Sequence, residues 1–279
     1  MKRTGIRMLV MLLGGVSRLA FAQLQVLPEA SPPCVFGGGE QSMVVRWRNA
    51  SGQPIAAQLH WRLSQTSSAT VAPLMEQPWK QLEMLRGQTI LDNVSVHLPA
   101  VKAKTKFLIQ WLADSNRVLG KSEVLVYPTN LLGELKLVLA ADDLGVLDPA
   151  RLLQPSLRDV GVVFLDLNEK PLEDFSGKLA VVCPFPSRGQ MPAGLAQSIQ
   201  ALARKGAGVI WIQPPPGPAD EITPSFYLVP EGKGVVLVVD PELVANFSDN
   251  PRSQLNFVYY CKLALKPTPP PLPNFSRLP

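Results

Sequence analysis

The chain has 279 residues, which is long enough for two domains of ordinary size. Its formal net charge is +5, but Lys2, Arg3, Arg7 and Arg18 all fall within the first 22 residues, so the rest of the chain carries a net charge of +1. That balance lacks the basic surplus that binding to phosphates requires, and it argues against nucleic acid as a partner.

Residues 1–22 have the pattern of a bacterial export signal. A basic front is followed by the apolar run Met8–Leu13, and Ala20-Phe21-Ala22 forms a small-x-small cleavage pattern. The apolar part is too short for a standard transmembrane helix, and Arg18 interrupts it. We therefore expect a periplasmic or secreted protein, attached to a membrane only if the signal peptide stays uncleaved.

Residues 23–40 are rich in Pro and Gly and predict an extended lead-in. Residues 41–128 then contain short segments in which apolar and polar residues alternate, such as Met43–Arg48, with Val45 and Trp47 on one face. The other candidate strands are 55–63, 71–74, 82–85, 89–98, 106–112 and 123–127. This pattern predicts an antiparallel β-sandwich, and it resembles the immunoglobulin or fibronectin type III class of exported domains.

From residue 131 the pattern changes to continuous apolar runs separated by helical segments. The predicted strands are 135–140, 160–167, 179–183, 209–212 and 234–239, and the predicted final helix is 253–265. The helix between the third and fourth strands places Leu195, Ile199 and Leu202 on one face and ends at Gly206. Residues 131–266 therefore predict a three-layer α/β domain with a mostly parallel sheet.

The last residues, 267–279, begin with the run Pro267-Thr-Pro-Pro-Pro-Leu-Pro273. Such a run predicts extended polyproline II structure. It is either a solvated end or a ligand for a domain that recognises proline-rich motifs.

Three segments of the second half carry a resemblance to a known family: LKLVLAAD, GKLAVVCPFP and ALARKGAGVIWI. They resemble the class I glutamine amidotransferase-like, flavodoxin-like α/β domains, whose active members use a Cys on a G-x-C-x-G elbow with a His and a Glu. In this chain Cys183 lacks the flanking glycines, and Pro184 removes a backbone N–H that an elbow could use as an oxyanion donor. The only histidines, His60 and His97, lie in the first half. The resemblance thus implies a member without the catalytic triad, and we assign no catalytic residue and no cofactor.

Four carboxylates are candidate ligand or metal residues. Asp142, Asp143, Asp166 and Asp240 each fall at the carboxyl end of a predicted strand, where ligands bind in open α/β sheets. The alternative is that they cap strands and helices, as Asp148 before Pro149 is expected to do.

Among the aromatic residues of the first half, Trp79 is the candidate for stacking on a sugar ring. Trp47, Trp61 and Trp111 fall on inward faces of their predicted strands, whereas Trp79 follows Pro78. Packing in the core is the alternative for all four indoles.

The three cysteines, Cys34, Cys183 and Cys261, are an odd number, so at least one cannot form an internal disulfide. Cys183 and Cys261 are either small buried apolar residues or a bridged pair, and their spacing leaves both readings open.

These patterns favour an exported, non-catalytic binding protein with a degenerate amidotransferase-like domain and an envelope or extracellular protein as its partner. Two alternatives remain. One is a hydrolase or metal-dependent enzyme that uses the four carboxylates, and the other is a carbohydrate-binding accessory protein that uses Trp79.

Overall fold

The computed structural model describes residues 24–29, 31–66, 70–114, 117–213 and 226–267. The predicted signal peptide, residues 214–225 and the proline-rich segment from residue 268 lie outside these described residues. Within them the chain is mostly sheet, with antiparallel strand pairs, one largely parallel sheet and a few helices. This confirms the prediction that antiparallel sheets are followed along the chain by a mostly parallel sheet with helices.

Residues 24–127, which we call the double-sheet region, form two sheets with the strand orders β1-β3-β6 and β2-β8-β7-β4-β5. All neighbouring strands in them are antiparallel except β2 and β8, which are parallel. The strands are β1 Leu24–Val26, β2 Cys34–Phe36, β3 Gly39–Asn49, β4 Ile55–Thr66, β5 Val71–Met84, β6 Thr89–Leu98, β7 Thr105–Ala113 and β8 Arg117–Tyr127.

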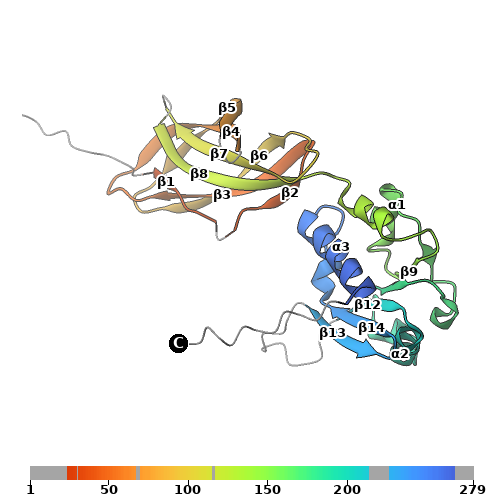
Figure 1. Cartoon of the computed structure of the whole chain (residues 1–279). Coiled ribbons are helices and arrows are strands. Elements are labelled where there is room, and N and C mark those ends of the chain that lie inside the picture. The colour runs from red at the N-terminus through yellow and green to blue at the C-terminus, as the bar shows by residue number, and fades with distance from the viewer. Residues whose placement is uncertain (1–23, 30, 67–69, 115–116, 214–225, 268–279) are drawn as a thin grey trace, which may run out of the picture.

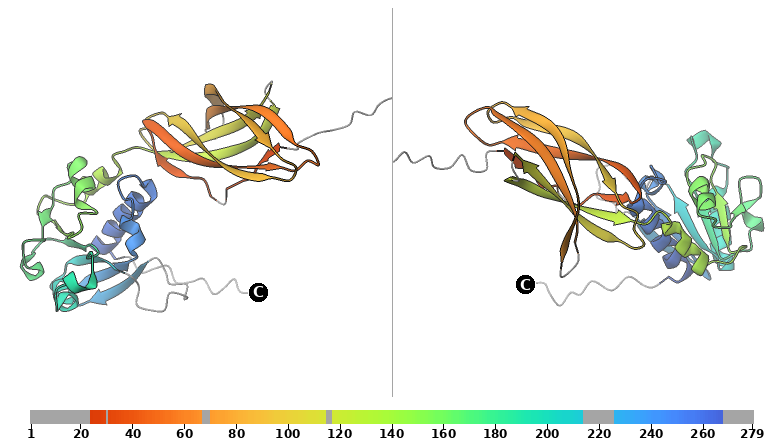
Figure 2. Two further views of the ribbon diagram at one scale, coloured as in Figure 1. Left: turned by 180° about the vertical axis from the view of Figure 1, so that it is seen from behind. Right: turned by 90° about the horizontal axis from the view of Figure 1, so that it is seen from above.

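The two sheets share one hydrophobic core, because alternate residues of each strand point toward the opposite sheet. Figures 1 and 2 show the sheets facing each other over the length of the region. The core includes Trp47 and Val96 from one sheet and Leu59, Ile109 and Trp111 from the other.

Two short pieces of the lead-in, which was predicted to be extended over residues 23–40, join the sheets as strands. Leu24 pairs with Asn49, which adds β1 to the smaller sheet, and Cys34 pairs with Leu125, which adds β2 to the larger one. The prediction missed these strands because three residues are too few to show a period.

The two weak strand predictions around Pro78 form one long strand, β5. It lies at the edge of its sheet, where the missing N–H of proline is tolerated. The pairing of β5 with β4 is irregular between Gln58 and His60, and His60 lies opposite Pro78. A bulge therefore accommodates the proline that had suggested a break.

Residues 131–266, which we call the mixed-sheet region, form one sheet with the strand order β10-β9-β11-β12-β14-β13. Neighbouring strands are parallel except β13, which is antiparallel to β14. The strands are β9 Leu144–Leu147, β10 Leu165–Asp166, β11 Leu179–Val182, β12 Gly208–Ile212, β13 Phe226–Glu231 and β14 Gly234–Val239. The helices are α1 Gln154–Asp159, α2 Leu195–Lys205 and α3 Pro251–Leu265, with 3₁₀ turns η1 Leu131–Leu137, η2 Leu172–Asp174, η3 Arg188–Gln190 and η4 Pro241–Val244.

Helices cover both faces of this sheet. Phe257 and Cys261 of α3 pack with Leu157 of α1 on one face, and Ile199 and Leu202 of α2 pack on the other. Figure 1 shows α3 and α2 on the two sides of the strands. Because both faces are buried, β11, β12 and β14 are continuous apolar runs.

The predictions for β11, β12, β14 and α3 are confirmed to within two residues at each end, and the predicted helix α2 ends at Lys205, directly before Gly206. The prediction of a strand at 135–140 is wrong, because this stretch is the end of η1 and a loop, with the side chain of Leu137 85% exposed. The strand at 160–167 shrinks to Leu165–Asp166, and Val163 is exposed. The antiparallel edge strand β13 was not predicted.

In the part of the chain that the structure describes, no helix is both long enough and apolar enough to cross a membrane.

Candidate functional site

The four candidate carboxylates lie at opposite edges of the mixed sheet. Asp142 and Asp143 precede β9, so the prediction that they follow a strand is wrong, and they lie at the amino edge. Asp166 ends β10 and Asp240 follows β14, which places both at the carboxyl edge. The error arose because the predicted strand at 135–140 does not form.

Asp166 and Asp240 are also far apart along the carboxyl edge. Strands β9, β11 and β12 lie between β10 and β14. Four steps of about 4.8 Å separate the two carboxylates by roughly 19 Å, too far to share an ion. Among the described residues, no group of three or more His, Cys, Asp or Glu side chains is placed to hold a metal ion.

Each of these two carboxylates has local partners. Burial alone would raise the pKa of Asp166, but hydrogen bonds from Asn168 and Gln154 and the charge of Arg158 outweigh it and lower the pKa. Oδ1 of Asp166 accepts from the backbone N of Asn168 at 3.0 Å and from its Nδ2 at 2.7 Å. Oδ1 of Asp240 accepts from the backbone N of Glu242 at 2.8 Å and caps η4. Both carboxylates therefore stabilise turns.

At the amino edge, Asp143 joins two chain segments. Its Oδ2 accepts from the backbone N of Ala140 and from Nζ of Lys178, both at 2.9 Å. These two interactions, the backbone bond first, lower the pKa of Asp143 below its ordinary value of 3.8.

This lowered pKa predicts a pH dependence. A carboxylate with a lowered pKa stabilises the folded state above the pKa it has when unfolded, and this contribution is lost as pH falls through the folded-state pKa. We expect the urea midpoint of Asp143→Asn to lie below that of the wild type at pH 7, with the difference disappearing as pH falls through the lowered folded-state pKa of Asp143. The control is Asp142→Asn, which replaces a neighbouring exposed carboxylate. An equal effect of this control would show that the stabilisation does not come from the contacts of Asp143 with Ala140 and Lys178.

The most enclosed polar group of the region is Asp148, directly after β9. It is fully buried, and its carboxylate accepts three backbone N–H groups, from Leu152 at 2.9 Å, Leu153 at 2.8 Å and Gln154 at 2.9 Å. The expectation that Asp148 caps a helix beginning at Pro149 is thus wrong in detail. It closes the loop that leads to α1, which begins at Gln154.

Cys183 lies beside Asp148, directly after β11. Its backbone N donates to the carbonyl O of Leu147 at 2.8 Å, and its thiol lies close enough to the Asp148 carboxylate to be affected by its charge. The thiol is 1% exposed. Burial first, and then the charge and hydrogen bond of Asp148, raise its pKa well above the ordinary value of 9.0. Cys183 is therefore a neutral thiol inside the protein.

Cys261 lies in the same core cluster, and burial raises its pKa as well. Cys183 and Cys261 are both free thiols, so the pair is not bridged.

Both histidines lie in the double-sheet region. His60 is on β4, with Nε2 3.7 Å from Oε1 of Glu76, and His97 is exposed on β6 opposite Glu40.

Trp79, the candidate for sugar stacking, packs against the core of the double-sheet region. The centroid of its ring lies 6.1 Å from that of Trp47 and 5.9 Å from that of Trp111. Nζ of Lys80 lies 5.1 Å from the centroid of the Trp79 ring. The indole is partly buried. It contributes to a tryptophan cluster, and only part of its surface is open to a ligand.

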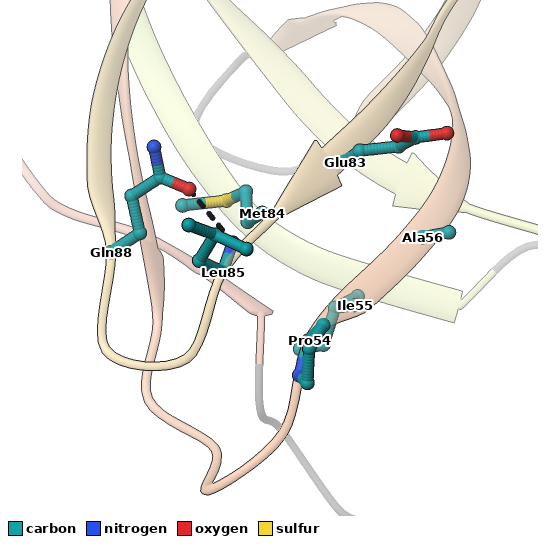
Figure 3. A pocket seen from close by; sticks show the side chains of 7 residues that line it. All are labelled: Pro54, Ile55, Ala56, Glu83, Met84, Leu85 and Gln88. Carbon is teal, nitrogen blue, oxygen red and sulfur yellow. Dashed lines mark hydrogen bonds between the residues drawn. The ribbon is translucent and has the colours of Figure 1, made fainter.

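A surface depression of about 520 Å³ lies at the end of the double-sheet region, between the turns that follow β3 and β5. Figure 3 shows its lining, with Pro54 and Ile55 on one side and Leu85 and Gln88 on the other. Oε1 of Gln88 accepts from the backbone N of Leu85 at 2.7 Å, the bond drawn as a dashed line. Gln88 thus holds a turn, and Glu83 is the other polar side chain of the lining.

Sequence reasoning missed the pairing of Asp148 with Cys183. The signal for it was that each residue directly follows a short apolar run, at Leu144–Leu147 and Leu179–Val182. Recognising the first run as a strand would have placed the two side chains at one edge of adjacent parallel strands.

No family model matches this sequence, and no curated protein matches it. Solved structures that it is similar to include the alkylpurine DNA glycosylase AlkC of Pseudomonas fluorescens, with 11% identity over 38% of this chain and 31% of that one and a TM-score of 0.30. They also include the sporulation control protein Spo0M of Bacillus subtilis, with 11% identity over 43% of this chain and 57% of that one and a TM-score of 0.30. A β-glucosidase of Listeria innocua has 13% identity over 38% of this chain and 16% of that one, with a TM-score of 0.29.

The chain thus spans between 16% and 57% of the length of these three proteins. They are unlike one another, and at TM-scores of 0.29 and 0.30 the similarities carry no argument about fold or function.

Proposed function

We propose that this protein is an exported, non-catalytic binding protein whose partner is an envelope or extracellular protein. In this proposal the double-sheet region is an immunoglobulin- or fibronectin-type-III-like module, and the mixed-sheet region is an amidotransferase-like scaffold without the catalytic triad. The observation that supports this proposal most is that Cys183 is a buried, neutral thiol. The family resemblance places Cys183 where active members have their nucleophile.

A nucleophilic cysteine must be reachable and must ionise, because the thiolate is the attacking species. Cys183 is 1% exposed, and its pKa is raised well above 9.0. The Asp148 carboxylate beside this thiol accepts hydrogen bonds from three backbone N–H groups. This arrangement supports a structural role for both residues.

The two alternative functions have less support. A metal-dependent enzyme would need the carboxylates together, and they divide between two edges of the sheet. Sugar binding through Trp79 would need an open ring face, and that ring packs against Trp47 and Trp111.

Thiol labelling provides the first test. We expect iodoacetamide to modify Cys34, which is partly exposed, while Cys183 and Cys261 react at least about 100-fold more slowly in the native protein. All three should react in guanidinium, as mass spectrometry of tryptic peptides would show. Rapid native labelling of Cys183 would contradict its assignment as a buried structural thiol.

Turnover and binding provide the second test. The purified chain and its Cys183→Ala variant should hydrolyse glutamine and simple esters no faster than buffer, and both should cross-link to the same envelope protein. Turnover that Cys183→Ala abolishes, with no cross-linked partner for either protein, would overturn the proposal.

A further inference from the structure

A cluster of three aromatic rings lies beside the free edge of the mixed sheet. Phe226 begins β13, the last strand in the sheet order, and packs against Tyr259 and Tyr260 of α3. The centroid of Phe226 lies 6.5 Å from that of Tyr259 and 5.1 Å from that of Tyr260. Tyr260 is buried, whereas Tyr259 is 53% exposed. The cluster thus offers an aromatic surface on a rigid helix.

A groove of about 380 Å³ continues from this cluster toward the amino end of α3. Tyr260, Asn256 and Ser253 line its helical side, and Asp240 and Glu242 contribute two carboxylates on the other. Arg252 also lines the groove, but its Nη2 is directed at Sγ of Cys34, at 3.6 Å. The groove therefore combines aromatic, amide and acidic groups.

The segment that follows α3 has matching chemistry. It begins Pro267-Thr-Pro-Pro-Pro-Leu-Pro273, carries Lys266 and Arg277, and contains no acidic residue. Proline-rich segments dock on aromatic-lined grooves because polyproline II is rigid before binding and loses little entropy on docking.

The lengths also agree for a segment that returns along α3. Tyr259 lies six residues before Leu265, or about 9 Å along the helix axis. Three residues of polyproline II cover the same distance at about 3.1 Å each, which brings Pro269 and Pro270 level with Tyr259. Ser253 lies about 18 Å back, a distance that about six polyproline II residues cover, so the run is level with Ser253 near Leu272. The residues from Asn274 to Arg277 are then surplus length, which lets Arg277 turn toward Asp240 and Glu242 at this end of the groove.

We propose that residues 267–279 fold back along α3, with the prolines on Tyr259 and Phe226 and Arg277 paired with Asp240 or Glu242. The groove is then an interaction surface for a basic proline-rich segment, and the chain's own tail is its occupant. The short tether gives the tail an effective concentration of about millimolar, so a modest intrinsic affinity suffices. This proposal does not depend on the absence of catalysis proposed above.

The test uses the full chain with Pro269, Pro270 and Pro271 replaced by Gly, so that its own tail no longer competes. A synthetic peptide of residues 266–279 is titrated into it by calorimetry. We expect saturable binding, weakened tenfold or more by Tyr259→Ala in the host. Asp240→Asn with Glu242→Gln in the host should weaken binding several-fold, and more at low salt than at high salt. Leu91→Ala, which alters an exposed apolar residue on β6, should change nothing.

Two results would overturn the proposal. One is the absence of binding at millimolar peptide, or binding that Tyr259→Ala leaves unchanged. The other is association of the unaltered chain into dimers that the Gly substitutions dissolve, seen by analytical ultracentrifugation. That outcome would assign the groove to the tail of a second copy.

Discussion

Replacing Asp148 with Ala is expected to lower the free energy of unfolding by about 3–5 kcal/mol, a large part of the total stability of an ordinary domain. Asp148 is fully buried and accepts three backbone N–H groups. Without the carboxylate, donors of Leu152, Leu153 and Gln154 lose their charged partner in a place with little access to water. Each unsatisfied buried donor costs about 1–3 kcal/mol. Urea denaturation followed by circular dichroism measures the change.

Asp240→Ala is the matched control for this prediction. It removes the same side chain from the same edge of the sheet, but Asp240 accepts one backbone N–H at a partly exposed cap. We expect a loss of about 1 kcal/mol, typical of a single cap. If Asp148→Ala costs no more than Asp240→Ala, then Asp148 does not hold the loop before α1 as described.

The parts of the mixed-sheet region that sequence predicted well are those whose local pattern agrees with their tertiary surroundings. Leu195, Ile199 and Leu202 of α2 are spaced for one helical face, and all three are buried against the sheet. The apolar runs of β11, β12 and β14 are covered on both faces, so composition alone identifies them.

The failure at the first strand has a specific cause. The run Leu135–Ala140 is more apolar than Leu144–Leu147, yet the second run forms the strand. Gly145 interrupts the apolar run, so composition does not identify this segment as a strand. The fold requires glycine at this position, because a Cβ would lie 2.7 Å from the side chain of Leu167 and 2.8 Å from the ring of Phe175. No local pattern reports such a contact.

That one error decided the carboxylate hypothesis. Residues that precede a strand of a parallel sheet lie at the amino edge, and residues that follow it lie at the carboxyl edge. Asp142 and Asp143 precede β9, so they lie at the edge opposite to the one that a strand at 135–140 predicted. The absence of histidine after residue 97 could be read directly from the sequence. The aromatic cluster of Phe226 and Tyr259 could not, because it joins a strand that was not predicted to a helix 33 residues away.

Replacing Trp111 with Ala is expected to destabilise the protein by about 3–5 kcal/mol, as large-to-small changes in a packed core do. Its ring is fully buried, meets that of Trp47 edge-on at 5.8 Å, and donates from Nε1 to Oγ of Ser122 at 2.9 Å. The substitution leaves a cavity between the two sheets and an unpaired hydroxyl. Thermal or urea unfolding measures the loss.

Trp79→Ala separates packing from ligand binding in the same cluster. Because Trp79 is only partly buried against Trp47 and Trp111, we expect a smaller loss of about 1–2 kcal/mol, with no change on a glycan array. The outcome that would contradict packing as its role is unchanged stability together with the loss of a glycan signal that the wild type gives. That outcome would not change the role of Trp111, whose indole is fully buried in the core. Trp79 differs because it lies on the edge strand β5 and is only partly buried.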